Sequence, residues 1–437
     1  MLEYDIANAK HGATLTFKNQ IYDFKGQWVY GNAWERFGLY NKYVVLRDDG
    51  EIFKLNAHAG ELAPGSTEDL VKTIMRLDLD SCQLNAPLTI ELDPTYTCYS
   101  KDCGSHCFSA EYRLENPRLS IPTNTIEDIL NTFSDAGGLI VRFDGGGDPL
   151  AHKDVRNGYL VALAHKLGLK TTILTSGDAL TSTNLELLGA SNCYLRISLN
   201  AATDKTRQIF HGNKSSVTKI FNQISSFSQW LKVNNPTLPI ATTYLLSDKN
   251  YSEVYDCALQ AKEAGFNHFS VRRILGPDSL RSNFSEDQLE EIDAQFEKIK
   301  NISDNTFRSF LPWRNLNQPD LNPSANDFIA ATCWQSIFKV IIEPSHEKNY
   351  RAQLCGRYRG GGIGQKMQLP ALLESNDGLD WLSLWQDSFL KYKYKRSELP
   401  FTCISCIDRG FIKMIDNLIS FLGNTKNDFE ILHLYEE

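Results

Sequence analysis

The chain lacks the features that would place a protein in a membrane, outside the cell or on nucleic acid. No run of 18 or more apolar residues occurs in its 437 residues, so no membrane-spanning helix is expected. The first residues lack the basic and apolar stretches of a secretory signal peptide. Basic residues are in deficit, and the net charge of −8 gives no support to nucleic-acid binding. These absences favour a cytoplasmic protein with neither membrane nor nucleic acid as a partner.

Internal repeats and low-complexity segments are also missing. The composition, 42% hydrophobic and 22% charged, is that of an ordinary globular protein with room for two or three domains. Ten cysteines are present, but they fall in short-spaced groups, and the chain is far larger than the small secreted scaffolds that disulfides hold together. A reducing compartment therefore fits best, and the grouped cysteines call for another explanation.

Three of these cysteines directly follow a short apolar strand predicted at residues 88–93. Cys98, Cys103 and Cys107 have the spacing C-x4-C-x3-C, and no fourth cysteine lies near them. Three thiolates can hold three irons of a [4Fe–4S] cluster and leave the fourth iron open to a ligand that is not protein. Part of a zinc site is an alternative, although structural zinc sites usually have four ligands with paired cysteines. Plain surface thiols are another.

From residue 88 the sequence alternates between predicted strands and helices. Strands are predicted at 88–93, 139–144, 170–174, 194–199, 238–246 and 268–275. Helices are predicted at 125–136, 155–167, from 183, 217–233 and 253–264, the first capped by Thr125 and ended by Gly137 and Gly138. Six such repeats over roughly 190 residues imply a parallel sheet, whereas a full eight-stranded barrel needs about 250. The fold class predicted is α/β, a partial (β/α)6 TIM-like barrel or a doubly wound sheet.

The unusual residues of this region all follow the ends of predicted strands. After the cysteine loop come Gly145–Pro149, then Thr175-Ser176-Gly177, then Ser198 and Asn200, and finally Gly276-Pro277. In parallel α/β architectures the rim at the carboxyl ends of the strands carries the chemistry. The sequence therefore predicts one functional rim, although Gly145–Pro149 on its own is also compatible with a tight turn.

Further units are predicted on both sides of the barrel. Residues 1–87 indicate a small accessory α+β domain, with strand-like runs at 13–18, 20–24 and 43–46, a turn at 48–50 and a helix at 67–77. Residues 88–280 form the barrel, and 281–330 a helical linker with a charged helix at 287–302. Residues 331–437 make a final unit.

In this order, the motifs resemble those of the radical S-adenosylmethionine (radical SAM) superfamily over residues 88–280. The matching features are the cysteine loop, Gly146-Gly147-Asp148-Pro149 in place of a Gly-Gly-Glu-Pro motif, the turn at Thr175, and Arg196-Ile197-Ser198. The family's usual spacing is C-x3-C-x2-C, so each gap here is one residue longer. The position before the last cysteine is usually aromatic and lies near the adenine; here it is His106, followed by Phe108.

The final unit resembles the twitch and SPASM domains of the same superfamily. The matching stretch runs from Cys333 through a strand pair at 338–343 and 350–354 to Cys355, and then to Cys403 and Cys406. Four cysteines with a terminal C-x2-C imply one auxiliary [4Fe–4S] cluster, as in twitch domains. Structural zinc is the alternative, because the same hook serves both metals.

The resemblance also implies roles for the residues of the rim. Backbone groups of the Gly146–Pro149 turn would approach the methionine amine of S-adenosylmethionine. Ser198 and Asn200 would bind its carboxylate or ribose. The remaining cofactor-binding candidates are Thr175, Ser176, Ile274, Leu275, His106 and Phe108. No residue is indicated as the catalytic partner of the substrate.

The function implied is reductive cleavage of S-adenosylmethionine to a 5′-deoxyadenosyl radical, followed by oxidative modification of a peptide, as in a maturase that forms a cross-link or dehydrogenates. An external donor of flavodoxin or ferredoxin type would supply the electron, and the N-terminal domain would dock the peptide by strand addition. One alternative is a dehydrogenase or epimerase of a small molecule such as a sugar, aminocyclitol or nucleoside. Another is a non-catalytic iron–sulfur electron carrier or a zinc-stabilised binding protein.

Overall fold

The computed structural model describes most of residues 85–311 and parts of the chain beyond them. The described ranges are 85–100, 103, 107, 109–212, 216–274, 283–311, 339–346, 349–353 and 381–386, with the backbone of β15 and of five N-terminal strands. These strands form a pair, β1 (Thr14–Phe17) and β2 (Gln20–Asp23), and a three-stranded antiparallel sheet of β3 (Gln27–Val29), β4 (Tyr43–Leu46) and β5 (Ile52–Leu55). The strand-like runs at 13–18, 20–24 and 43–46 are thus confirmed. The predicted turn at 48–50 and the predicted helix at 67–77 fall outside the described residues.

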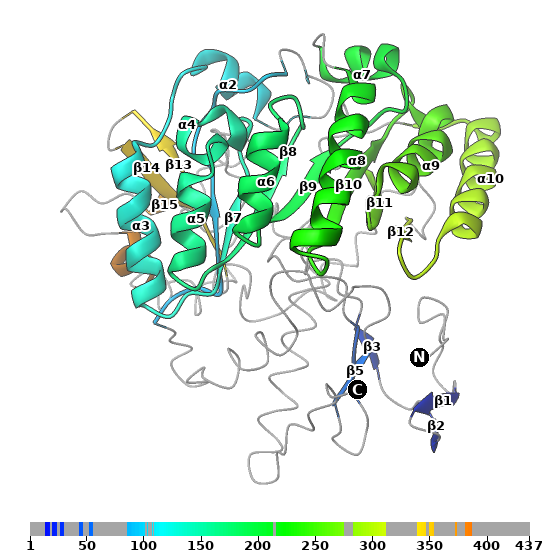
Figure 1. The fold of residues 1–437 in the computed structure, drawn as a ribbon, viewed down its shortest axis with the longest axis horizontal. Coiled ribbons are helices and arrows are strands. Elements are labelled where there is room, and N and C mark those ends of the chain that lie inside the picture. The colour runs from blue at the N-terminus through cyan, green and yellow to red at the C-terminus, as the bar shows by residue number, and fades with distance from the viewer. Residues whose placement is uncertain are drawn as a thin grey trace, which may run out of the picture.

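One ten-stranded sheet dominates the molecule (Figure 1). Its strand order is β12-β11-β10-β9-β8-β7-β6-β13-β14-β15, with β6 to β13 parallel and β14 and β15 antiparallel to their neighbours. The strands are β6 (Thr89–Leu92), β7 (Ile140–Phe143), β8 (Lys170–Thr175), β9 (Tyr194–Ser198), β10 (Ile240–Leu246), β11 (His268–Arg273), β12 (Arg308–Phe310), β13 (Lys339–Ser345), β14 (Asn349–Gln353) and β15 (Leu372–Leu373). All six strands predicted for the barrel are present, which confirms an α/β fold with a mostly parallel sheet.

Helices cover one face of this sheet, where α3, α5, α6, α8, α9 and α10 stand side by side (Figure 1). The helices are α2 (Ala110–Glu115), α3 (Thr123–Asp135), α4 (Lys153–Arg156), α5 (Tyr159–Lys166), α6 (Ser182–Ala190), α7 (Asp204–His211), α8 (Val217–Asn234), α9 (Val254–Ala264) and α10 (Glu286–Ile302), with short 3₁₀ turns η3 (Pro149–Ala151) and η4 (Tyr251–Glu253). No described helix has both the length and the apolar character that crossing a membrane requires.

Two predicted helices differ from the structure. The helix predicted at 155–167 is broken into α4 and α5, because Gly158 adopts a left-handed conformation with φ of 79°. The helix predicted to be capped by Thr125 begins at Thr123, directly after Pro122. Its predicted end is confirmed, since Gly137 follows the helix with φ of 86°. Three short elements of three to eight residues, α2, α7 and β12, were not predicted from the sequence.

The two faces of the sheet differ sharply in chemistry. Residues paired across parallel strands point to the same side, and the side alternates along each strand. The row Leu92, Phe143, Ile173, Leu195 and Ile240 is almost fully buried and belongs to the hydrophobic core beneath the helices. The adjacent row on the opposite face is polar and contains Glu91, Arg142, Thr172 and Tyr194. The face away from the helices therefore forms a polar inner surface.

Buried ion pairs line this inner surface at β6, β7 and β13. The Glu91 carboxylate lies 3.1 Å from Lys339 Nζ and 3.3 Å from Arg142 Nη1. Arg142 also contacts Asp144 at 2.9 Å. Because these side chains are largely removed from water, the attraction between their opposite charges must offset the free-energy cost of desolvating them.

The predicted strand pair at 338–343 and 350–354 is present as β13 and β14, and it joins the main sheet through β6. Trp381 and Trp385 lie in the same hydrophobic core as the barrel strands, with the Trp381 ring 6.2 Å from that of Phe133 on α3. Part of residues 331–437 thus packs directly on the barrel. The boundaries between the four predicted units stay predictions.

Candidate functional site

The loops that follow β6 and β7 are joined by hydrogen bonds at the carboxyl rim of the sheet. The Gly146 amide donates to Asp93 Oδ2 at 3.1 Å, and the Gly147 amide donates to the Thr95 carbonyl at 3.1 Å. The Asp148 amide donates to the Thr97 carbonyl at 2.9 Å. These bonds connect the glycine turn to the segment that leads directly into Cys98.

This close approach explains the two glycines. A Cβ on Gly147 would lie 2.2 Å from the Thr97 carbonyl oxygen, and one on Gly146 would lie 1.9 Å from the Tyr96 ring. From the sequence, these glycines were predicted to allow close contact with a bound methionine amine. The structure supplies a further reason, because the cysteine loop itself occupies the space that a side chain would need.

The three cysteines of the loop lie at the same rim. Cys103 is buried, whereas Cys98 and Cys107 are half-buried. The Cys107 amide donates to the Cys103 carbonyl at 2.9 Å, and Cys107 Sγ lies 3.3 Å from Ser109 Oγ. The Ser109 hydroxyl donates to the Gly146 carbonyl at 2.8 Å, so the end of the cysteine loop is tied to the glycine turn as well.

The surroundings of Cys98 act on its thiol in opposing directions. Burial raises the pKa of the Cys98 thiol to about 12, and the charge of Asp148 adds to the effect. The Arg113 guanidinium on α2 acts in the opposite direction. Its Nη1 donates to the Ser100 carbonyl at 2.8 Å, while its buried Nε has no hydrogen-bond partner among the described residues. A bound metal deprotonates a thiol outright, so the donor set and the nearby cation fit an iron–sulfur cluster held by thiolates.

No three His, Cys, Asp or Glu side chains of the described residues converge closely enough to hold a single metal ion. The placement of the three sulfurs around a cluster therefore stays a prediction.

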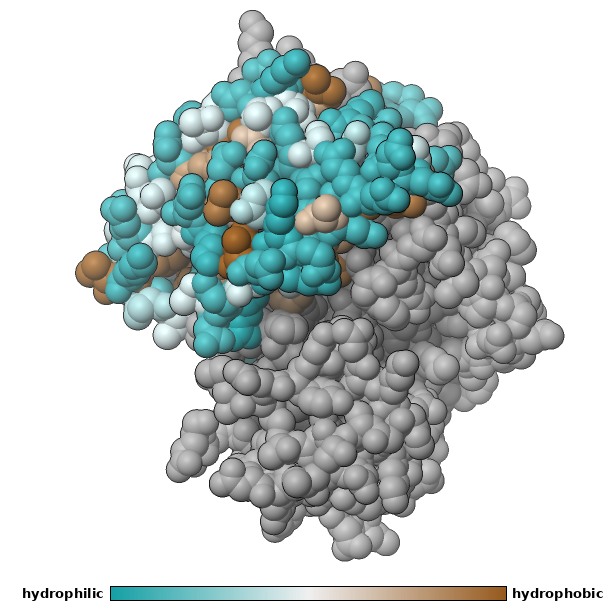
Figure 2. Space-filling view, turned by 90° about the vertical axis from the view of Figure 1, so that its right-hand side faces the viewer, coloured by the Kyte–Doolittle hydropathy of each residue, from teal (hydrophilic) through white to brown (hydrophobic). Residues whose placement is uncertain are grey.

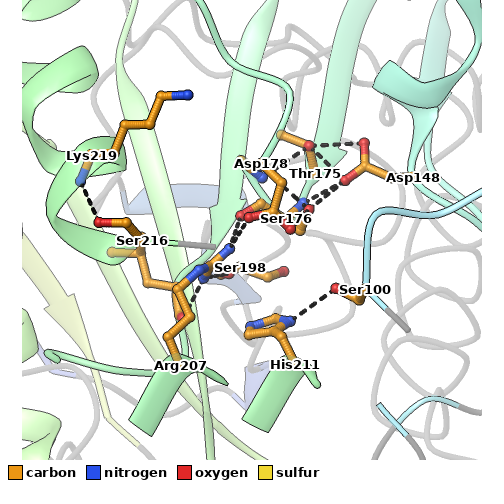
Figure 3. A network of polar contacts seen from close by, with 12 residues as sticks. Ser100, Asp148, Thr175, Ser176, Asp178, Ser198, Arg207, His211, Ser216 and Lys219 are labelled. Atoms are coloured by element: carbon orange, nitrogen blue, oxygen red, sulfur yellow. Dashed lines mark hydrogen bonds and ion pairs between the residues drawn. The ribbon is translucent and has the colours of Figure 1, made fainter. Parts of the chain in front are cut away.

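Asp148 connects the glycine turn to the end of β8 (Figure 3). Its carboxylate accepts hydrogen bonds from Thr175 Oγ1 at 2.9 Å, from the Ser176 amide at 2.9 Å and from Ser176 Oγ at 2.6 Å. The Leu150 amide adds a fourth donor at 2.9 Å. Burial raises the pKa of this carboxyl, and the hydrogen bonds from Ser176, Thr175 and Leu150 oppose that rise. The hydroxyls of Thr175 and Ser176, both predicted to line the cofactor, thus serve first to hold Asp148.

Arg207 on α7 was not identified from the sequence, yet it fixes the ends of two strands (Figure 3). Its side chain is fully buried and contacts Asp178 at 3.0 Å. It donates to the carbonyls of Ser176 at 2.6 Å, Leu199 at 2.8 Å and Ser198 at 3.2 Å. Thr203 as the N-cap of α7 and Gly212 at its end were sequence signals that could have indicated this helix.

Replacing Arg207 with methionine should destabilise the protein by about 3–5 kcal/mol, because a buried carboxylate and three carbonyls would lose their cation. Chemical denaturation monitored by circular dichroism measures the change. Lys300→Met is the matched control, since Lys300 pairs with Glu297 at an exposed site and should cost less than about 1 kcal/mol. Equal losses in the two variants would contradict the role given to Arg207.

Asn200 follows β9 in a left-handed conformation with φ of 58° and is buried. Its Oδ1 accepts from the Leu245 amide at 2.8 Å, and its Nδ2 lies 3.3 Å from His211 Nε2. Its carbonyl accepts from Asn250 Nδ2 at 2.9 Å. Both atoms of the Asn200 side-chain amide therefore already have partners within the protein, and its predicted contact with carboxylate or ribose stays a prediction.

Tyr96 joins the cysteine loop to the hairpin of β13 and β14. Its hydroxyl donates to Glu343, whose carboxylate also accepts from Arg351 Nε at 2.6 Å. Arg351 lies over the ring of Tyr112, 5.3 Å from its centroid, and that ring packs edge-on against Tyr96. Burial raises the pKa of Tyr96, and the negative charge of Glu343 raises it further, so the phenol stays protonated as a donor.

The remaining predicted site residues divide into two groups. Ser198 ends β9, Ile274 is buried directly after β11, and Pro149 begins η3 beside Asp148. The others lie outside the described residues; they are His106, Phe108, Leu275, Cys333, Cys355, Cys403 and Cys406.

The fold and rim together define an α/β protein with a mostly parallel sheet. The chain is similar to Streptococcus suis SuiB, solved with bound S-adenosylmethionine, at a TM-score of 0.54 and 17% identity, over 80% of this chain and 78% of that one. The structure of SuiB bound to the precursor peptide SuiA is similar to the same degree. Its TM-score is 0.54 and its identity 17%, over 80% of this chain and 77% of that one. At this identity the similarity concerns the fold alone. No protein-family model matches the chain.

Proposed function

We propose that this protein is a radical SAM enzyme that oxidatively modifies a peptide. The observation that carries the proposal is at the carboxyl rim of the sheet. There the three-cysteine loop is hydrogen-bonded to the glycine turn, in a chain whose fold is similar to that of SuiB. Cys98, Cys103 and Cys107 would hold a [4Fe–4S] cluster through three thiolates. When bound, cluster and S-adenosylmethionine supply a 5′-deoxyadenosyl radical through one-electron cleavage of the sulfonium.

The protein's own contribution is to position and shield these groups. The backbone of Gly146, Gly147 and Asp148 is fixed by the cysteine loop, so the turn would be preorganised as a site for a bound amine. Thr175 and Ser176 lie at the end of β8, Ser198 at the end of β9 and Ile274 directly after β11, at the same rim, where they would border the nucleoside. A flavodoxin- or ferredoxin-type protein would deliver the electron.

A peptide is the substrate that several features favour together. SuiB, which shares the fold, has been solved with its precursor peptide SuiA. The antiparallel sheet of β3, β4 and β5 offers an edge to which an extended peptide could add a strand. Cys355 follows Gln353 of β14 by two residues, so the hairpin that braces Tyr96 would also lead to the auxiliary cluster of Cys333, Cys355, Cys403 and Cys406. That cluster would accept the electron that oxidation of the substrate releases.

The test is anaerobic reconstitution with iron and sulfide, followed by incubation with S-adenosylmethionine and dithionite. We expect 5′-deoxyadenosine and methionine to form only when the reductant is present. Zinc in the protein, with no 5′-deoxyadenosine formed, would contradict the enzymatic role and favour a zinc-stabilised binding protein.

A second experiment identifies the substrate class. Co-expression with candidate precursor peptides should yield a peptide whose mass has fallen by two hydrogen atoms. If no peptide changes while a sugar, aminocyclitol or nucleoside stimulates formation of 5′-deoxyadenosine, the substrate is a small molecule instead.

A further inference from the structure

His211 is a buried imidazole beside the cysteine loop that the proposed cofactor contacts do not use. It is the last residue of α7 and is 3% exposed. Its Nδ1 lies 3.9 Å from Cys103 Sγ. The same nitrogen lies 3.4 Å from Ser100 Oγ, a contact drawn in Figure 3. On the other side of the ring, Nε2 lies 3.3 Å from Asn200 Nδ2. The ring thus spans the space between the cysteine loop and the end of β9.

Neighbouring backbone groups determine which nitrogen of this ring carries the proton. The Leu245 amide can only donate, so the Asn200 side-chain atom that it contacts at 2.8 Å must be Oδ1. The other atom of that amide, Nδ2, is then a donor directed at His211 Nε2. Nε2 must accept, and a neutral imidazole therefore carries its hydrogen on Nδ1. That hydrogen faces Cys103 and Ser100.

The position of α7 makes this arrangement rigid. The Glu253 carboxylate accepts from the amides of Ala202 and Thr203, at 2.9 and 3.1 Å, and from Thr206 Oγ1 at 2.6 Å. Arg207 fixes the middle of the helix to β8 and β9. Gly212 ends the helix with φ of 60°, directly after His211. The imidazole therefore lies at the C-terminal end of a short helix whose start and middle are both anchored.

We infer that His211 is a positioning residue that donates its Nδ1 hydrogen to the Cys103 thiolate and thereby raises the reduction potential of the rim cluster. This inference rests on the proposed function. The carbonyl oxygen of His211 also lies 3.9 Å from Cys103 Sγ. A carbonyl oxygen can accept a hydrogen bond from the protonated thiol, but it has no hydrogen to donate to a thiolate. Once the sulfur binds iron, Nδ1–H is the group of His211 that can stabilise it. Hydrogen bonds to the sulfurs are among the factors that set iron–sulfur potentials.

The acceptor Ser100 Oγ competes for the same hydrogen at 3.4 Å. Ser100 is itself anchored, because its carbonyl accepts from Arg113 Nη1 at 2.8 Å. A thiolate carries a full negative charge and a hydroxyl does not, so charge favours the sulfur as the acceptor when the cluster is bound.

The test compares His211→Leu, which removes the donor, with His211→Asn, whose amide can donate from about the position of Nδ1. In the full-length reconstituted protein, the rim cluster is recognised as the one whose electron paramagnetic resonance (EPR) signal changes when S-adenosylmethionine is added. We expect its midpoint potential to be more negative in His211→Leu than in the wild type, and close to the wild type in His211→Asn. Equal potentials in all three proteins would overturn the inference, as would equal shifts in both variants.

A second measurement on the wild type covers the case in which His211→Leu fails to assemble its cluster. Protein labelled with ¹⁵N-histidine should show a weak hyperfine coupling from one imidazole nitrogen in the pulsed EPR spectrum of the reduced rim cluster. That coupling should vanish in His211→Asn. Its absence in the wild type, or its persistence in His211→Asn, would overturn the inference. Failure of the wild type to bind a cluster would instead overturn the proposed function.

Discussion

Replacing Cys103 with alanine should abolish the reductive formation of 5′-deoxyadenosine. Cys103 is the buried member of the cysteine loop, and its carbonyl holds the Cys107 amide at 2.9 Å. Two thiolates cannot supply the three protein ligands that a site-differentiated cluster needs. Activity should therefore fall to that of the control without enzyme, and the rim cluster should lose its EPR response to S-adenosylmethionine. Cys98→Ala and Cys107→Ala should behave in the same way.

Cys257→Ala is the matched control for this experiment. Cys257 is fully buried on α9 within the hydrophobic core, and burial together with the charge of Glu253 keeps the pKa of its thiol raised. The substitution removes one sulfur atom from the core and should lower stability modestly while leaving cluster and activity in place. If Cys103→Ala retained activity, or Cys257→Ala lost it to the same extent, the assignment of the cysteine loop would be wrong.

Gly147→Ala should also inactivate the enzyme, although no reacting group is removed. The new Cβ would lie 2.2 Å from the Thr97 carbonyl oxygen and 2.6 Å from that of Thr95, and both are backbone atoms that cannot rotate away. The cysteine loop must therefore shift, at a cost of about 3 kcal/mol. That shift breaks the bonds from Gly147 and Asp148 to the loop, which set the path of the chain into Cys98. We expect less iron to be bound and 5′-deoxyadenosine formation to be lost.

Gly168→Ala separates this steric effect from the general strain of replacing a glycine. Gly168 lies between α5 and β8 with φ of 77°, and an added Cβ would meet nothing within 4 Å. It should cost about 1–2 kcal/mol for the left-handed backbone alone, with the cluster intact. Thermal unfolding measures the loss of stability, iron content measures cluster binding, and turnover measures the formation of 5′-deoxyadenosine. Full activity in Gly147→Ala would contradict the close packing of the two loops.

The strands of the barrel could be predicted from the sequence because each combines an apolar run with turn residues after it. The elements that were missed are short, and their stability comes from tertiary contacts. Helix α7 has eight residues and owes its position to Glu253, which lies about 50 residues further along the chain. No local periodicity contains that information.

The same cause explains which site residues were missed. Arg207 and His211 both lie on α7, so neither could be related to the rim before that helix was known. In contrast, Asp148, Thr175 and Ser176 were placed at one rim by the order of strands, and the structure brings them into direct contact. The split of the predicted helix at 155–167 has a different origin, because Gly158 interrupts a pattern that is otherwise continuous.

The central claim is that three thiolates hold a cluster with one iron open to S-adenosylmethionine. EPR spectroscopy of the reduced, reconstituted protein with and without that nucleotide tests it most directly. The account predicts that one cluster signal changes when S-adenosylmethionine is added, and that Cys98→Ala lacks this response. A wild-type spectrum that S-adenosylmethionine leaves unaltered would contradict the claim.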